Sequence, residues 1–366
     1  MTEEKIERYA DLLLAYCMEV KAGERLLVST TTLAEPLVNE LYRQCQQQGV
    51  VMDVLFDFEK KQSYFNTYAH EAQARYVSET FLRAMQEFEC YLVIRAPYLQ
   101  STAALASPEI AAIAAQARKP ANDLYFQRTA TRELKRNLCQ FPTAQGAKDA
   151  GMTLEEYTQF VENACFLTEE NPADQWRQVR ANQQHIVDKL NSCTQFTYTG
   201  PGFSISFNTT GRTWINSDGK TNMPSGEVYT SPVEDSVNGN IRFSFPSIYQ
   251  GFALEDVELT VKDGLITAWT CKNDAHVLDE VFAIPGARRF GEAAIGTNYR
   301  INRITKNILY DEKIGGSVHM AIGQSYLQAG GKNSSAIHWD MISDMKQGGQ
   351  IHADGELVYE NGKFLF

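Results

Sequence analysis

The sequence predicts an α/β domain over residues 1–195, followed by a β-rich domain of α+β, barrel-like character over residues 196–366. Three observations predict this division. In the first part, short apolar runs alternate with helical segments, as in parallel βαβ units. From about Thr194 onward, strands of alternating apolar and polar residues are separated by Gly, Asn and Asp turns. A length of 366 residues is sufficient for two domains that each bury a core.

The elements of the first domain alternate between helix and strand. Residues 1–20 open with acidic residues and hold only a short apolar run, which indicates an amphipathic helix and not a signal peptide. Residues 24–30 and 50–56 are apolar strands joined by a helix that ends at Gly49, so they form a βαβ unit. Further elements follow along the chain: a helical stretch at 70–88, a strand at 89–98 and a long helix at 172–193.

The second domain is predicted from its alternating strands and its turns. "DGEL" and "ENGK" near the C-terminus are typical of β-hairpin turns. One helix, at about 274–284, interrupts the strands. The strand-forming segments lie at residues 195–208, 212–220, 240–271 and 349–366.

Charge and cysteine content restrict the function classes. The formal net charge of -11 disfavours nucleic acid and anionic membrane surfaces as partners. The seven cysteines contain no CxxC pair, which fits a reducing compartment, and no apolar run has the length of a membrane span. We therefore expect a cytoplasmic protein. HExxH, GxSxG, phosphate-loop and dinucleotide-binding glycine signatures are absent from the sequence.

The stretch "SAIHWDMI" (residues 335–342) has an unusual polar face. Read as a strand, it points Trp339 and Met341 to one side and His338 and Asp340 to the other. Ligands at positions i and i+2 of a strand can reach one cation without bending the backbone. This pair is the strongest local indication of a metal site.

Other candidate residues precede this strand. His319 alternates with an apolar face formed by Val318 and Met320, and Glu292 is flanked by apolar and small residues. A buried carboxylate must be paired or coordinate a metal, so Glu292 is a candidate ligand. Glu227, Glu312 and Tyr326 complete the candidates.

Each candidate also has a structural interpretation. Glu227 could be a solvated turn residue, and Glu312 with its charged neighbours could form an exposed corner. His319 could be a hydrogen-bonded core histidine. The set as a whole combines carboxylates with two imidazoles and contains no sulfur, which suits zinc, cobalt or manganese. One carboxylate can bridge two such ions.

Four stretches carry a family resemblance: "GEVYTSP", "FGEAAIGTN", "NILYDEKIGGSVHMAIGQSY" and "AIHWDMI", in that order. With them the chain resembles the thermophilic-type metalloaminopeptidases, the aminopeptidase T and aminopeptidase S family, also called leucyl aminopeptidases of that type. The likeness runs over most of the chain and is specific in the C-terminal half. The spacing from Glu312 to His319 is wider than in the "DEN" form of the family motif, and the link from His319 to His338 is shorter.

The resemblance implies a fold, an assembly and a site. The fold would be an α/β N-terminal domain with a β-rich C-terminal metal domain, assembled as a homodimer. Tyr326 looks like the active-site tyrosine of the family, and Glu292 would bridge a pair of divalent ions. The ligands of these ions would be Glu227, Glu292, Glu312, His319, His338 and Asp340.

This resemblance predicts an aminopeptidase that removes the N-terminal residue of short peptides. The ion pair would activate a water and polarise the scissile carbonyl. Glu227 or a neighbouring carboxylate could take the proton of the water, and Tyr326 could donate to the oxyanion.

Two alternatives belong to other classes. His319, His338 and Asp340 would also suit a mononuclear non-haem iron site, as in a dihydroxypyridine ring-cleaving dioxygenase. The retained glutamates favour the peptidase, because a one-iron site has no need of a bridging carboxylate. A second alternative is a non-catalytic binding protein with a structural metal, although six ligands and a tyrosine favour an open, working site.

Overall fold

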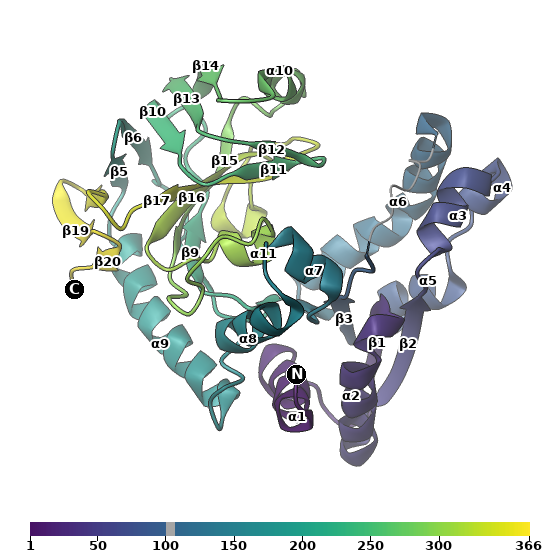
Figure 1. The fold of residues 1–366 in the computed structure, drawn as a ribbon. Helices are drawn as coiled ribbons and strands as arrows, with labels where there is room; N and C mark the ends of the chain where they lie inside the picture. The colour runs from purple at the N-terminus through teal and green to yellow at the C-terminus, as the bar shows by residue number, and fades with distance from the viewer. Residues whose placement is uncertain (100–106) are drawn as a thin grey trace. The chain divides into compact units, whose positions relative to one another are not determined.

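The computed structural model describes residues 1–99 and 107–366, and the contacts divide the chain into two compact units (Figure 1). The first unit consists of Met1–Ala173 and Gly219–Met223, and the second of Asp174–Asp218 and Pro224–Phe366. The contacts thus group most of the long helix α9 (Pro172–Asn191) with the second unit. The domain boundary predicted at 195/196 placed this helix with the first. Its residues Val187 and Leu190 contribute to the core of the second unit, which explains the grouping.

The first unit contains a parallel five-stranded sheet of order β2-β1-β3-β4-β8. Its strands are β1 (Arg25–Thr31), β2 (Val51–Asp57), β3 (Cys90–Arg95), β4 (Lys135–Gln140) and β8 (Asn222–Met223). Its helices are α1 (Glu3–Asp11) with a π-helical continuation over Leu12–Cys17, α2 (Glu35–Gln48), α3 (Lys61–Tyr68), α4 (Glu71–Ala74), α5 (Glu79–Glu87), α6 (Pro108–Ala130), α7 (Ala144–Asp149) and α8 (Leu154–Ala164).

The predicted βαβ unit is confirmed. β1 and β2 pair in parallel, and α2 connects them. Gly49 ends α2 at a φ of 71°, a left-handed conformation that favours glycine. Among the described residues, none of the helices combines the length and apolar character required to cross a membrane.

The second unit is β-rich, as predicted, and its strands form antiparallel sheets. One has eight strands in the order β14-β13-β10-β6-β5-β18-β19-β20, and another has five in the order β17-β16-β15-β9-β7. The strands of the larger sheet are β5 (Gln195–Gly200), β6 (Phe203–Asn208), β10 (Asn238–Phe243), β13 (Val257–Lys262), β14 (Leu265–Thr270), β18 (Gln350–Ala353), β19 (Glu356–Glu360) and β20 (Lys363–Phe364). Those of the smaller are β7 (Ile215–Ser217), β9 (Glu227–Thr230), β15 (Phe290–Gly296), β16 (Ser317–Gly323) and β17 (His338–Asp344).

The remaining elements of this unit are short. β11 (Ser247–Tyr249) and β12 (Phe252–Leu254) form a two-stranded hairpin. The α-helices besides α9 are α10 (Ala275–Phe282) and α11 (Ile308–Asp311), and Leu327–Ala329 form a short 3-10 helix. The predicted hairpin turns near the C-terminus are confirmed, since β18, β19 and β20 pair antiparallel in succession.

One hydrophobic core lies behind the five-stranded sheet. Val318, Met320 and Ile322 of β16 and Trp339 and Met341 of β17 all belong to it. The same core takes up side chains from the larger sheet and from α9. Alternation along each strand therefore fixes which residues face the core and leaves the opposite face of β16 and β17 for polar groups.

This core makes a stability prediction at Met320, whose side chain is 0% exposed. Met320→Ala should lower the free energy of unfolding by about 2–5 kcal/mol, because truncation loses apolar burial and leaves a cavity. Intrinsic tryptophan fluorescence during urea unfolding is a suitable measurement, since all four tryptophans lie in the second unit. Leu265→Ala is the control, because Leu265 is 42% exposed and its loss should cost under about 1 kcal/mol. Equal losses for both variants would contradict the assigned core.

Candidate metal centre

Five predicted ligands come from four adjacent strands of the five-stranded sheet. Glu227 begins β9, Glu292 lies in β15, His319 lies in β16, and His338 and Asp340 lie in β17. Register brings them together, since Ala321 of β16 pairs with Glu292 on one side and with Asp340 on the other. The polar face predicted for the two histidine-bearing strands is therefore a continuous feature of the sheet.

Glu292 reaches this face because of a β-bulge. Phe290, Ala293 and Ile295 belong to the core, so the inward side of β15 changes from even to odd residue numbers between residues 290 and 293. The register of β15 with β16 shifts at the same place. A bulge re-aims the following side chain, and here it turns Glu292 toward His319 and His338. Gly291 makes this possible, because a Cβ there would lie 2.4 Å from the carbonyl oxygen of Gln324.

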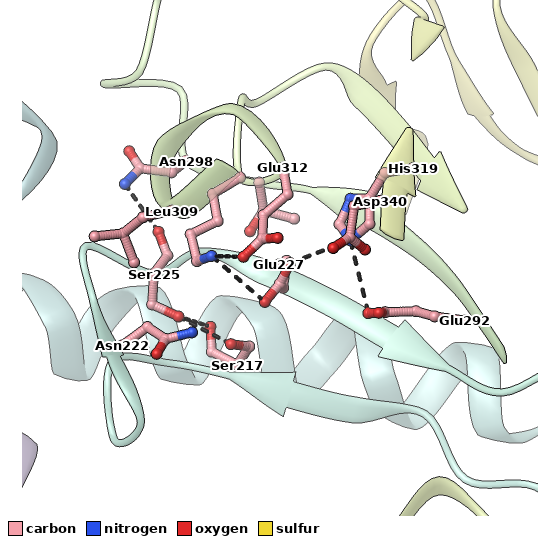
Figure 2. A network of polar contacts seen from close by, with 12 residues as sticks. Ser217, Asn222, Ser225, Glu227, Glu292, Asn298, Leu309, Glu312, His319 and Asp340 are labelled. Carbon is pink, nitrogen blue, oxygen red and sulfur yellow. Dashed lines mark hydrogen bonds and ion pairs between the residues drawn. The ribbon is translucent and has the colours of Figure 1, made fainter. Parts of the chain in front are cut away.

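The side chains converge within short distances, and Figure 2 shows Glu227, Glu292, His319 and Asp340 among them. His319 Nε2 lies 3.3 Å from Glu227 Oε2 and 3.6 Å from Glu292 Oε1. His338 Nε2 lies 3.0 Å from Glu292 Oε2 and 3.5 Å from Asp340 Oδ1. Glu292 thus directs one carboxylate oxygen to each histidine.

These contacts define two groups that could hold a cation. Ligand atoms of Glu227, Glu292 and His319 lie within 4.8 Å of one another, and so do those of Glu292, His338 and Asp340. Glu292 is common to both groups. This arrangement agrees with the bridging role that the resemblance implies for Glu292.

Contacts with the backbone restrain two of the ligand residues. His338 Nδ1 lies 2.7 Å from the carbonyl oxygen of Gln324, so Nδ1 donates and Nε2 is directed toward the carboxylates. Gln183 of α9 is buried, and its side-chain amide donates to the carbonyl of Glu227 at 3.2 Å. The first contact fixes the direction of the His338 ring, and the second anchors the main chain at Glu227, before any ion binds.

Glu312 occupies a different place. It caps the C-terminal end of α11 and forms a close ion pair with Lys313. Neither of the two ligand groups among the described residues includes Glu312. The interpretation of residues 311–313 as an exposed charged corner is wrong: Asp311 and Lys313 are buried, and the side chain of Glu312 is 14% exposed. Asp311 accepts hydrogen bonds from the backbone and the hydroxyl of Thr305 instead.

Lys313 is the residue that the sequence interpretation missed. Its side chain is 0% exposed, and its Nζ lies 3.9 Å from Glu227 Oε1. Burial favours a neutral lysine, but the carboxylates of Glu227 and Glu312 outweigh burial and raise the pKa of Lys313. A lysine beside an acidic motif is ordinarily solvated, so the sequence contains no signal for this position.

Tyr326 lies beside the ligand groups. Its ring centroid is 5.0 Å from that of His338 and 5.0 Å from that of Tyr229. Burial and the nearby carboxylates raise the pKa of the Tyr326 phenol well above its ordinary value of 10.0, so the hydroxyl keeps its proton as a donor. The structure thus brings Tyr326 next to the groups of candidate ligands.

The charges of the ligand groups depend on one another. Burial would lower the pKa of His319, but Glu292 and Glu227 outweigh it and raise that pKa to about 9. Burial would raise the pKa of Asp340, but His338 outweighs it and lowers that pKa to about 2. The carboxylates therefore require positive charge nearby, either from imidazolium or from a cation.

The donor set fits a metal. Glu227 Oε2, His319 Nδ1, His338 Nε2 and Asp340 Oδ1 are buried, and none makes a well-aligned hydrogen bond among the described residues, although three of them have ion-pair contacts within the ligand groups. Three of these four atoms point into the ligand groups. Buried polar atoms without partners are costly, and a divalent ion would satisfy them.

The fold and this oxygen- and nitrogen-rich cluster define a metal-dependent enzyme. A family model described as thermophilic metalloprotease (M29) matches residues 2–364. The chain therefore belongs to the thermophilic metalloprotease (M29) family, and it is a hydrolase of the metalloaminopeptidase type.

Individual relatives agree with this family. The chain is 25% identical over 414 residues to aminopeptidase 2 of Geobacillus stearothermophilus, covering 100% of this chain and 98% of the relative. It is 30% identical over 236 residues to aminopeptidase PepS of Streptococcus thermophilus, covering 55% of this chain and 56% of the relative. The solved structure of wild-type AmpT from Thermus thermophilus has the same fold, with a TM-score of 0.86, 20% identity and 100% coverage of both chains. The dioxygenase and non-catalytic alternatives have no support in these matches.

The shared position of Glu292 makes a prediction. Glu292→Gln should lose at least one ion per chain and lower turnover by about a hundredfold or more, because both ligand groups lose a charged ligand. Metal content by mass spectrometry beside steady-state kinetics checks this. Glu258→Gln on β13 is the control and should change neither quantity. A Glu292→Gln variant with full metal content and activity would refute the bridging role.

Proposed function

We propose that the protein is an aminopeptidase that hydrolyses the N-terminal residue from short peptides with a co-catalytic pair of divalent ions: zinc, cobalt or manganese. The observation that carries this proposal is the pair of ligand groups that share Glu292. One carboxylate placed between two histidines is suited to bridging two ions.

The proposed ligands follow from the two groups. Glu227 and His319 would hold one ion, His338 and Asp340 the other, and Glu292 would contribute an oxygen to each. Glu312 was predicted as a sixth ligand, and its ion pair with Lys313 supports a different role for it.

The chemistry divides between the metal and the protein. Divalent ions act as Lewis acids on a peptide carbonyl and make water a better nucleophile at neutral pH. Glu227 directs Oε2 into the first ligand group, 3.3 Å from His319 Nε2, which supports its proposed role as acceptor of the proton of the water. Tyr326 keeps its proton and lies beside His338, which supports donation to the oxyanion as it forms.

The anionic site also supports the restriction to an N-terminal residue. A free α-amino group is cationic or metal-binding, and both forms are favoured beside carboxylates. We further propose a homodimer in the cytoplasm. The seven cysteines are free, in keeping with a reducing compartment, and the family resemblance supports the dimer.

The function predicts a specific substrate requirement. The metal-loaded enzyme should release the first residue of a short peptide, and acetylation of the peptide amine should abolish release. EDTA treatment should stop the reaction, and zinc, cobalt or manganese should restore it with two ions per chain. Mass spectrometry of products and of metal content measures both. Cleavage of the acetylated peptide, or a single iron per chain without a second ion, would contradict the proposal.

Tyr326 provides a separate prediction. Tyr326→Phe should bind metal normally, while kcat falls by about a hundredfold or more, the effect of losing one oxyanion donor. KM should change little, because the lost bond forms only in the transition state. Tyr249→Phe is the control, since Tyr249 packs on Trp339, which points to the opposite side of β17. Unchanged kcat, or metal lost together with activity, would exclude this role.

A further inference from the structure

A buried ammonium lies at one end of the ligand groups. Lys313 Nζ contacts Glu312 and lies 3.9 Å from Glu227 Oε1, and the lysine side chain is 0% exposed. A charge removed from water is costly unless it is paired, so these two carboxylates hold the ammonium in place. With no exposed surface, Lys313 is positioned to act on neighbouring residues and not on a bound peptide.

Glu227 connects the ammonium to the ligand groups. Its Oε1 faces Lys313, and its Oε2 lies 3.3 Å from His319 Nε2. Figure 2 shows Glu227 between Glu312 on one side and His319 and Glu292 on the other. One carboxylate is therefore shared between a fixed cation and the ligand group that it forms with Glu292 and His319.

The second ligand group makes no ion pair with this ammonium. Among the described residues, the ion pairs of Lys313 run to Glu227 and Glu312, and none runs to Glu292, His338 or Asp340. Two groups that share Glu292 thus differ in their electrostatic surroundings. The first must accommodate an ion at a carboxylate 3.9 Å from an ammonium, whereas the ammonium acts on the second group, at Asp340, only from beyond ion-pair distance.

We propose that Lys313 is a positioning residue that makes the two ion sites unequal. The ion held by Glu227, Glu292 and His319 binds weakly, and the ion held by Glu292, His338 and Asp340 binds tightly. The inference rests on the proposed two-ion function. Like charges close together in a poorly solvated site repel one another, and Lys313 also draws electron density from the Glu227 carboxylate.

The same contact assigns a role to Glu312. Its side chain contacts the Lys313 ammonium directly, so Glu312 is placed to tune Lys313 instead of binding an ion. We call the site formed by Glu227, Glu292 and His319 the weak site, and the other the tight site. Removing Lys313 and removing Glu312 should therefore change the metal affinity of the weak site in opposite directions. A lysine that served packing alone would not produce such a pair of opposite effects.

The experiment is a calorimetric titration of the metal-free full-length protein with Mn²⁺. Wild type should bind two ions with dissociation constants that differ by at least about tenfold. Lys313→Met should tighten the weak site by at least about tenfold and leave the tight site within about threefold. Glu312→Gln should weaken the weak site by at least about threefold, because the ammonium loses its main counter-charge.

Controls separate this effect from misfolding. Removing one partner of a buried ion pair destabilises a protein, so the double variant Glu312→Gln/Lys313→Met removes both charges and preserves the approximate side-chain shape. It should still tighten the weak site by at least about threefold, because the contact with Glu227 is lost. Lys332→Met, at an exposed lysine, should bind both ions like wild type.

Two results would overturn the proposal: equal affinities in wild type, or a double variant that binds both ions as wild type does. Failure of the proposed function is distinguishable from either. In that case the two unequal binding phases and their response to the variants would persist, while the loaded protein released no N-terminal residue.

Discussion

The accumulation of carboxylates on one face of a sheet is the constraint on which the second unit depends. Glu227 and Glu292 are buried, and Asp340 is 11% exposed at its side chain. Each anion withdrawn from water costs several kcal/mol unless positive charge or hydrogen bonds replace its hydration. The fold supplies part of that charge through His319, His338 and Lys313, and divalent ions are the natural source of the rest.

Rigidity of this face follows from the core behind it. β15, β16 and β17 each present alternate residues to a packed interior, so a ligand cannot turn away without moving an apolar neighbour out of the core. The backbone contacts of His338 and Glu227 add a second restraint. Ligand geometry is thereby maintained by the strands themselves, which is the arrangement that an ion site with demanding distances requires.

Much of this organisation could be predicted from local pattern. A strand has a side-chain period of two, so the sequence around His319 and around His338 was sufficient to separate their core faces from their polar faces. The βαβ unit that ends its helix at Gly49 and the C-terminal hairpins are equally local. A turn glutamate and a lone tyrosine have no distinctive periodicity, so local pattern could not identify Glu227 and Tyr326. They were predicted because the residues around them resemble a family motif.

By itself, the sequence determined the alternation of elements, the polar faces of β16 and β17, and the kind of chemistry that carboxylates and imidazoles can perform. Tertiary structure alone decided three further points. The bulge at Gly291 turns Glu292 to the site, because pairing with β16 sets the register. The Lys313 side chain is buried against Glu227 and Glu312, although its sequence context predicts a solvent-exposed lysine. Contacts group α9 with the β-rich unit. Each of these depends on which distant segments meet, and no local pattern of residues encodes that.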